Sequence, residues 1–170
     1  MICPHCGFDN LPGSEECSRC HQDLTQLDRP QAQDRVECSL MEDTVRVLNP
    51  RPPVTAPPGM SVREAVRLLL DNNTGALLVV DEGGQLLGIF TERDVLLKAV
   101  GTGVDRERAT VGELMTARPA FVSPEHRLAF VLNQMDAGGY RHVPVVENGR
   151  PVAMLSIRDV VRHITRLCES

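Results

Sequence analysis

Apolar residues recur at helical spacing in two stretches of the chain, around residues 62–70 and 128–135. Each stretch places its apolar side chains on one face of a predicted helix. Each ends at residues that stop a helix, Asn72-Asn73 in the first and Gly138-Gly139 in the second. The positions predicted to be buried are Val62, Ala65, Val66, Leu69 and Leu70 in the first helix, and Leu128, Val131, Leu132 and Met135 in the second.

A short apolar run follows each of these helices, and we predict that it forms a buried strand. A glycine-bearing turn and a return strand come next, and then a final helix. A short extended piece precedes each first helix. The order β-α-β-β-α therefore occurs twice, which predicts an α+β fold. The predicted strands lie at 54–56, 76–80 and 86–90 in the first copy, and at 120–122, 142–146 and 152–155 in the second.

The two copies superpose when the chain is shifted by 66 residues, so that Val79-Val80 falls on Val145-Val146. The hairpin loop that follows is one residue longer in the first copy, and beyond it the offset becomes 65. A slip in a hairpin loop is well tolerated. We place the first copy at 43–106 and the second at 107–170. The last helix of the second copy is predicted to bury Val160, Val161, Ile164, Leu167 and Cys168.

A seven-residue motif recurs where each return strand meets the last helix, as Gly88-Ile-Phe-Thr-Glu-Arg-Asp94 and Ala153-Met-Leu-Ser-Ile-Arg-Asp159. One interpretation is a capping box, in which hydroxyl and carboxylate satisfy the free N–H groups of the first helical turn. The other is a nucleotide site. Helix N-termini attract phosphate, and a carboxylate can hold a ribose diol.

The repeat and its two motifs resemble the CBS-domain family (cystathionine β-synthase domains), which usually occurs as tandem pairs. The resemblance covers about residues 43–168 and includes the strand His142-Val-Pro-Val-Val146, whereas Ala153 departs from the family's glycine. It implies two repeats packed about a pseudo-two-fold axis with two clefts between them. It also implies adenine nucleotides (AMP, ADP or ATP) or S-adenosylmethionine as regulatory ligands, and a homodimer of two pairs.

The resemblance assigns roles to particular residues. Two aspartates would hold the ribose hydroxyls, two hydroxyl side chains would contact the ribose or first phosphate, and strand edges would frame the base. Because an aspartate repels phosphate, the phosphates need cations nearby. These residues are Asp94, Asp159, Thr91, Ser156, Thr55 and Val122, with Arg93, Arg158, Arg141 and His142 as the candidate cations.

Each of these arginines has an alternative interpretation as a solvated surface charge. Tyr140 either edges the adenine or is a half-buried structural tyrosine. The second copy is expected to bind better, because the positions of Arg141 and His142 are occupied by Gly75 and Ala76 in the first copy.

Cysteine pairs near the N-terminus form two C-x-x-C knuckles, Cys3-Pro-His-Cys6 and Cys17-Ser-Arg-Cys20. Four thiolates at this spacing can complete a tetrahedral zinc site, and so short a segment needs metal to fold. With Gly7 after the first knuckle, the pattern resembles the small zinc-ribbon family. Iron and two disulfides are the alternatives. A four-cysteine shell is closed, so the predicted role is structural, with His5 and His21 as bystanders.

We assign residues 1–24 to the ribbon and 25–42 to a polar linker with room for a short helix. The only basic Lys or Arg of the ribbon is Arg19, opposed by four carboxylates at positions 9, 15, 16 and 23. Phosphate would be repelled, so nucleic acid is disfavoured and docking on protein is expected. Cys38 and Cys168 have no C-x-x-C partner and are interpreted as ordinary thiols.

Composition narrows the class of protein. Apolar residues make up 42 % and charged residues 24 %, as in globular domains, and the net charge of -5 argues against a general binder of nucleic acid or anionic membranes. No apolar run could span a bilayer, and the first residues lack the features of a signal peptide. We therefore expect a cytoplasmic protein with reduced thiols.

The sequence predicts a non-enzymatic regulatory sensor. It has no phosphate-binding G-x-x-x-x-G-K-[ST] loop, and His126, His142 and His163 form no recognisable catalytic set. Two alternatives stay open. One is a transcription-related protein whose ribbon contacts nucleic acid or polymerase, and the other is a purely structural dimerisation module with empty clefts.

Overall fold

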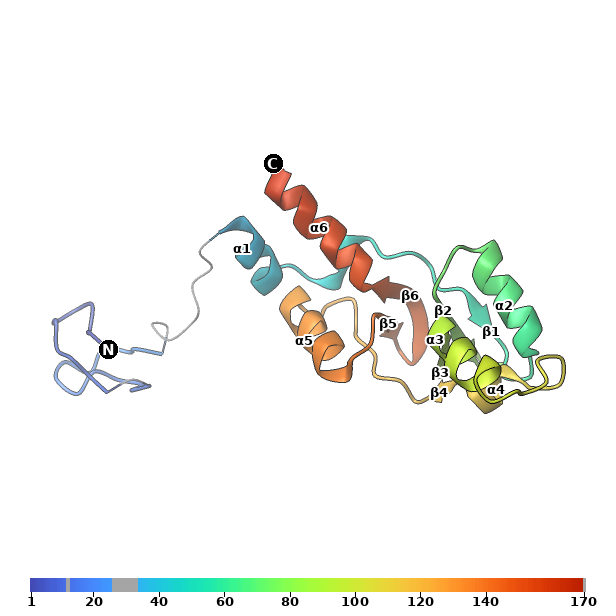
Figure 1. Ribbon diagram of the computed structural model, residues 1–170. Helices are drawn as coiled ribbons and strands as arrows, with labels where there is room; N and C mark the ends of the chain where they lie inside the picture. Colours follow the sequence, from blue (N-terminus) through green and yellow to red (C-terminus); the bar gives the residue numbers. More distant parts are fainter. Residues whose placement is uncertain (12, 26–33, 170) are drawn as a thin grey trace. The chain divides into compact units, whose positions relative to one another are not determined.

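A computed structural model describes residues 1–11, 13–25 and 34–169 of the chain. The chain divides into two compact units, residues 1–34 and 35–170 (Figure 1). The boundary lies inside the range predicted to be a linker, and residues 26–33 of that range lie outside the described residues. Residues 35–42 form helix α1 (Arg35–Glu42), which belongs to the second unit.

The first unit is built from two similar hairpins, one around each C-x-x-C knuckle. Bridges join Ile2 to Asp9 in the first hairpin and Glu16 to Asp23 in the second. The residue after each knuckle is left-handed, Gly7 with φ 71° and His21 with φ 58°. Glycine adopts this conformation freely, whereas histidine adopts it at a cost. His21 thus has a backbone role in the turn, and its side chain is exposed.

The second unit contains two lobes with matching sheets. In lobe 1 the strands β1 (Thr55–Ala56), β2 (Ala76–Val80), β3 (Leu86–Thr91) and β4 (Thr116–Ala117) lie side by side in that order. In lobe 2 the antiparallel pair is β5 (His142–Glu147) and β6 (Arg150–Ser156). A single bridge joins Val122 to Val145 on β5, in the place that β1 has beside β2. Another bridge joins Arg51 to Met154 on β6, in the place that β4 has beside β3.

The short helical segment at the start of each repeat packs on the lobe that is formed mainly by the other repeat. The 3₁₀ turn η1 (Val45–Leu48) belongs to the first repeat, yet Val45 N donates to the carbonyl of His126 at 3.0 Å in lobe 2. Its counterpart α4 (Val111–Leu114) belongs to the second repeat, and Val111 N donates to the carbonyl of Met60 at 2.8 Å in lobe 1. The matched exchange is what a pseudo-two-fold arrangement requires.

The remaining helices cover the sheets. Lobe 1 carries α2 (Val62–Asp71), the single turn α3 (Glu92–Asp94) and the π-helical segment η2 (Val95–Val100). Lobe 2 carries α5 (Leu128–Gly138) and α6 (Ile157–Glu169). Helix α1 packs on α5 and α6, where Ser39 Oγ lies 2.7 Å from His163 Nε2. The last helix of the first repeat thus consists of α3 and η2 and is short, with wide π-helical turns. The last helix of the second repeat, α6, is a regular α-helix.

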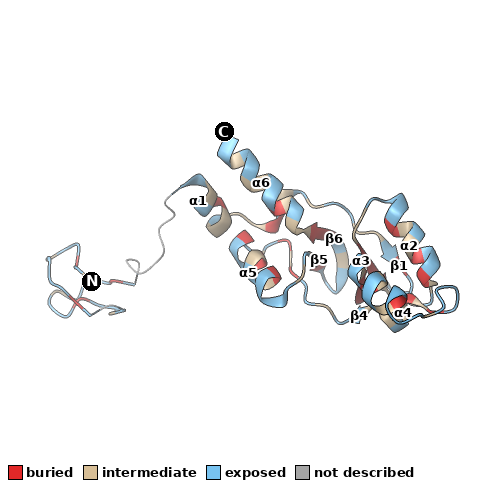
Figure 2. Ribbon diagram, in the orientation of Figure 1, coloured by how far each residue is buried: buried red, intermediate tan, exposed pale blue. Residues whose placement is uncertain are grey.

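Buried residues gather along the strands and the inner faces of the helices (Figure 2). Lobe 1 encloses Phe90 and Leu77, and lobe 2 encloses Leu155 and Val143. A third cluster takes residues from both sheets and joins the lobes; it consists of Ala76, Leu78, Ile89 and Met154.

Three predicted core positions are wrong. Leu70 is 72 % exposed although the preceding Leu69 is buried, so Leu70 lies outside the buried face of α2, and Val161 is 55 % exposed. Cys168 is also exposed. On α6 only Val160 is fully buried among the described residues, with Ile164 and Leu167 half-buried. The apolar face predicted for α6 was therefore wider than the face that the helix buries.

Candidate functional site

The first copy of the motif forms a complete capping box. Asp94 Oδ2 accepts hydrogen bonds from Thr91 N at 2.9 Å and Thr91 Oγ1 at 2.6 Å, and Asp94 N donates to Thr91 Oγ1 at 3.3 Å. The other carboxylate oxygen, Oδ1, lies 2.6 Å from Lys98 Nζ one turn later. Lys98 also donates to the carbonyl of Leu114 at 2.8 Å. Both oxygens of Asp94 are therefore engaged, and its side chain is only 10 % exposed.

The second copy repeats the carboxylate half of the capping box and leaves its aspartate more open. Asp159 Oδ2 accepts from Ser156 N and Ser156 Oγ, each at 2.8 Å. Among the residues that the structure describes, its Oδ1 has a single polar contact, at 3.5 Å with exposed Arg162, and the Asp159 side chain is 20 % exposed. A long contact with an exposed arginine is weak and easily exchanged. Asp159 thus keeps an oxygen that can accept a further hydrogen bond.

The capping box is therefore confirmed in full for the first copy and in its carboxylate half for the second, and neither excludes a second role. The difference between them comes from Lys98, which sequence reasoning missed. The i, i+4 spacing of Asp94 and Lys98 was the available signal, since such pairs meet on a helix. The position that matches Lys98 in the second repeat is His163, which contacts Ser39 on α1 instead of Asp159.

His142 lies at the start of β5, where the two repeats approach each other closely. A Cβ atom on Gly75 would lie 2.9 Å from His142 Cε1 and 3.3 Å from Glu92 Oε2, so a larger residue here would push these two side chains aside. Burial lowers the pKa of His142. The carboxylates of Glu92 and Asp159 act against this shift, and the positive charges of Arg158 and Arg141 add to it. His142 is therefore neutral at pH 7 and offers hydrogen bonding, which leaves the arginines as the cations beside Asp159.

The other predicted residues lie in varied surroundings. Arg93, Arg141, Arg158 and Thr55 are exposed. Tyr140 is half-buried against the core of lobe 2, and its hydroxyl lies 3.2 Å from Gln134 Oε1. The side chain of Val122 is fully buried in the same core, and its backbone N–H and C=O both pair with β5.

The four knuckle cysteines converge on one point in the first unit. Their sulfur atoms all lie within 4.8 Å of one another. Cys3 Sγ is 3.7 Å from Cys20 Sγ, and Cys6 Sγ is 3.6 Å from Cys17 Sγ. A tetrahedral zinc with Zn–S distances of about 2.3 Å has sulfur atoms roughly 3.8 Å apart. The four cysteines therefore fit a zinc site, and the sulfurs are too far apart for disulfides.

Hydrogen bonds prepare this cluster for a cation. Although burial raises it, the pKa of Cys17 falls to about 6 because N–H groups of Arg19 and Cys20 and the side chain of Asn10 point at the sulfur. The pKa of Cys20 rises to about 12 because burial and the other cysteines outweigh a hydrogen bond from Gln22. The first thiolate forms easily, and its negative charge then disfavours ionisation of the neighbouring thiols. A bound cation would remove this repulsion.

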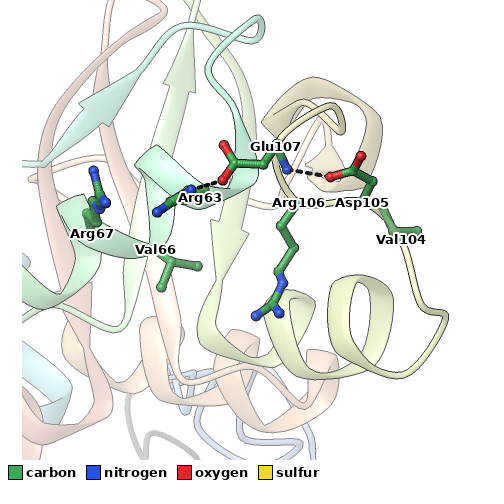
Figure 3. A pocket seen from close by; sticks show the side chains of 7 residues that line it. All are labelled: Arg63, Val66, Arg67, Val104, Asp105, Arg106 and Glu107. Carbon is green, nitrogen blue, oxygen red and sulfur yellow. Dashed lines mark hydrogen bonds and ion pairs between the residues drawn. The ribbon is translucent and has the colours of Figure 1, made fainter.

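A hollow of about 510 Å³ lies away from both motifs, between α2 and the loop 104–107 (Figure 3). Arg63, Arg67 and Arg106 line it, with Val66 and Val104 as its apolar part. Sequence reasoning missed this site, because its residues come from a helix and from the connection between repeats. The alternating charges of Asp105-Arg-Glu-Arg108 were the only local signal.

The family model of the CBS domain matches residues 45–101 and 111–166, and the chain therefore belongs to the CBS-domain family. A CBS domain-containing protein from Arabidopsis thaliana, CBSCBSPB3, is 34 % identical over 116 residues, which is 68 % of this chain. The match covers 21 % of that relative, so this chain spans about a fifth of its length.

Solved structures agree with this assignment. The CBS-domain protein ATU1752 from Agrobacterium tumefaciens is 38 % identical, with a TM-score of 0.62 over 66 % of this chain and 84 % of its own. The CBS domain pair of protein MJ0100 is 30 % identical, with a TM-score of 0.65 over 71 % of this chain and 98 % of its own. That structure is a complex with 5′-methylthioadenosine and S-adenosyl-L-methionine.

Among the described residues, no helix combines the length and the apolar character that crossing a membrane requires.

Proposed function

We propose that this protein is a non-enzymatic regulatory sensor that binds an adenine nucleotide beside Ser156 and Asp159. The observation that carries the proposal is the open Oδ1 of Asp159 at a motif of a CBS pair. The adenosine ligands of the MJ0100 pair support the ligand class. The ribose would bind to Asp159, and the exposed Arg158 and Arg141 would face the phosphates.

The proposal assigns the ligand to one motif. A ribose diol at Asp94 would have to displace Lys98 from a 2.6 Å ion pair in a mostly buried position. Such an exchange is costly because the mostly buried Asp94 would give up an ion pair and would gain only a hydrogen bond from a neutral hydroxyl group. Binding in the second copy would change the relation between the lobes only if the ligand prefers one arrangement of them.

We expect Asp159→Ala to weaken binding of AMP or ATP by about 1.5–3 kcal/mol, the loss of one charge-assisted hydrogen bond. Titration calorimetry on the folded protein measures this directly. Asp94→Ala is the matched control, because it removes the same group from the same motif and should leave the affinity unchanged. Equal losses in both variants, or none in Asp159→Ala, would disprove the assignment.

The second unit is proposed to form a homodimer. Four large apolar side chains on the adjacent segments α2 and η2 are exposed, Leu96 by 64 % and Leu97 by 60 % among them. Neighbouring apolar side chains on a surface favour association. The other two are Leu70 and Val100.

We expect Leu97→Glu to shift the protein from dimer to monomer, raising the dissociation constant roughly tenfold or more, because a carboxylate would be buried in the interface. Native mass spectrometry and light scattering report the mass. Val47→Glu is the control, since Val47 is 48 % exposed on η1, outside this set of residues. An unchanged mass for Leu97→Glu would exclude this surface as the interface.

The ribbon is proposed to hold a structural zinc ion and to dock on protein. Its described surface exposes Ile2 by 70 %, Phe8 by 40 % and Leu11 by 81 %, a large apolar fraction for so small a unit. The exposed carboxylates around it disfavour phosphate. These features support a partner with an apolar surface and a basic rim.

A further inference from the structure

The hollow between α2 and the loop 104–107 has basic groups on both of its walls. Arg63 and Arg67 come from α2, one turn apart, and Arg106 comes from the loop. Figure 3 shows Arg67 and Arg106 on either side of Val66 in that view. The volume of about 510 Å³ lies within the range of small-molecule sites.

Two of these arginines have no direct ion-pair partner in the described residues, although Arg67 is close enough to Glu64 to help lower the pKa of that carboxyl. Arg63 pairs with Glu107, and Asp105 accepts a hydrogen bond from the backbone of Glu107 at 3.0 Å. Within the described parts of the chain, neither Arg67 nor Arg106 forms an ion pair. The lining carries three arginines against the two carboxylates of Asp105 and Glu107, so the hollow has a small excess of positive charge on a protein whose net charge is -5. An anion would gain from both guanidinium groups.

The matched place in lobe 2 has a different construction. A shift of 66 residues brings 101–108 onto 35–42, and that segment is helix α1, which packs on α5. The half-buried Leu40 takes the place of Arg106. Ala129 and Asn133 on α5 take the places of Arg63 and Arg67. Neither the hollow nor its charge is thus imposed by the architecture of the repeat.

We propose that this hollow binds a small organic phosphate, with the phosphoryl group on Arg67 and Arg106 and the organic part against Val66 and Val104. Planar guanidinium groups match phosphate oxygens in pairs, and several arginines favour a dianion over a monoanion. The loop is already tied to α2, since Arg63 N donates to the carbonyl of Arg106 at 3.1 Å. The ligand would strengthen this tie between α2 and the connection from repeat 1 to α4.

The test uses the whole 170-residue chain with its metal bound, and three probes. Phenyl phosphate has the dianion and an apolar body, inorganic phosphate has the charge alone, and benzoate has the body with a single charge. We expect phenyl phosphate to bind best and to shift the amide resonances of residues 104–107 and of the first turns of α2. Arg67→Gln and Arg106→Gln should each weaken it roughly tenfold or more, as the loss of a charge-assisted bond predicts.

Arg108→Gln is the matched control, because it removes the same charge from the same loop without touching the hollow. It should leave phenyl phosphate binding unchanged, and so should Asp159→Ala. Shifts that move with Asp159→Ala would assign the probe to the nucleotide site and overturn the proposal. The proposal would also be overturned if phenyl phosphate caused no saturable shifts. Equal losses of affinity in all three arginine variants would overturn it too, because they would show only non-specific attraction to positive charge.

Discussion

Replacing Cys17 by serine is expected to release the metal and to unfold the first unit. The unit has a very small core: among its described residues only Cys3, Cys17 and Leu24 are buried apolar groups. A structural zinc contributes roughly 10–16 kcal/mol of apparent binding free energy in zinc-finger peptides, all of which counts toward folding. Hydroxyl oxygen is a poor substitute for thiolate on zinc, and hydrogen bonds to its sulfur lower the pKa of Cys17 to about 6.

The measurement is metal content by native mass spectrometry together with amide resonances of residues 1–25. The variant should lose zinc and the dispersed resonances of this unit. The second unit should keep its unfolding midpoint, because the two units are separately compact. Cys38→Ser is the control, since Cys38 is an exposed thiol on α1 and should alter neither property. A Cys17→Ser protein with a folded, zinc-loaded ribbon would disprove the metal assignment.

The fold was largely predictable because the sequence contains two copies of the same structural unit. Each predicted strand and first helix could be checked against a copy 65 or 66 residues away, and agreement between copies outweighs the ambiguity of short apolar runs. The cysteine cluster was predictable for a similar reason, since the ligands and their spacing are local. The predicted four-cysteine set is the one whose sulfur atoms converge.

Long-range features were not predictable. The exchange of η1 and α4 between lobes depends on how two repeats pack, and one repeat's pattern contains no such information. The exposure of the apolar residue Leu97, 60 %, depends on which side of its helix packs on the sheet, and no local pattern gives that. At the motif, the spacing of Asp94 and Lys98 allowed an ion pair, but the sequence did not show that Lys98 engages the second oxygen of Asp94.

The exchange of segments leads to the second large prediction, that the two lobes unfold together. Phe90 is fully buried in lobe 1, and Phe90→Ala is expected to cost about 3–5 kcal/mol of unfolding free energy. Lobe 1 cannot open without releasing α4 and its neighbours, which lead into lobe 2, while Val45 from repeat 1 is part of the lobe 2 core. The cluster of Ala76, Leu78, Ile89 and Met154 joins the sheets directly.

Hydrogen exchange tests this coupling, because it resolves amides in each lobe separately. In Phe90→Ala the slowest amides of β5 in lobe 2 should lose the same free energy of protection as those of β2 in lobe 1. Phe121→Ala is the control, since Phe121 is 57 % exposed and should change stability by no more than about 0.5 kcal/mol. Full protection of β5 beside a weakened β2 would show that the lobes unfold independently. A ligand at Asp159 would then stabilise lobe 2 alone, and coupling to lobe 1 would need another route.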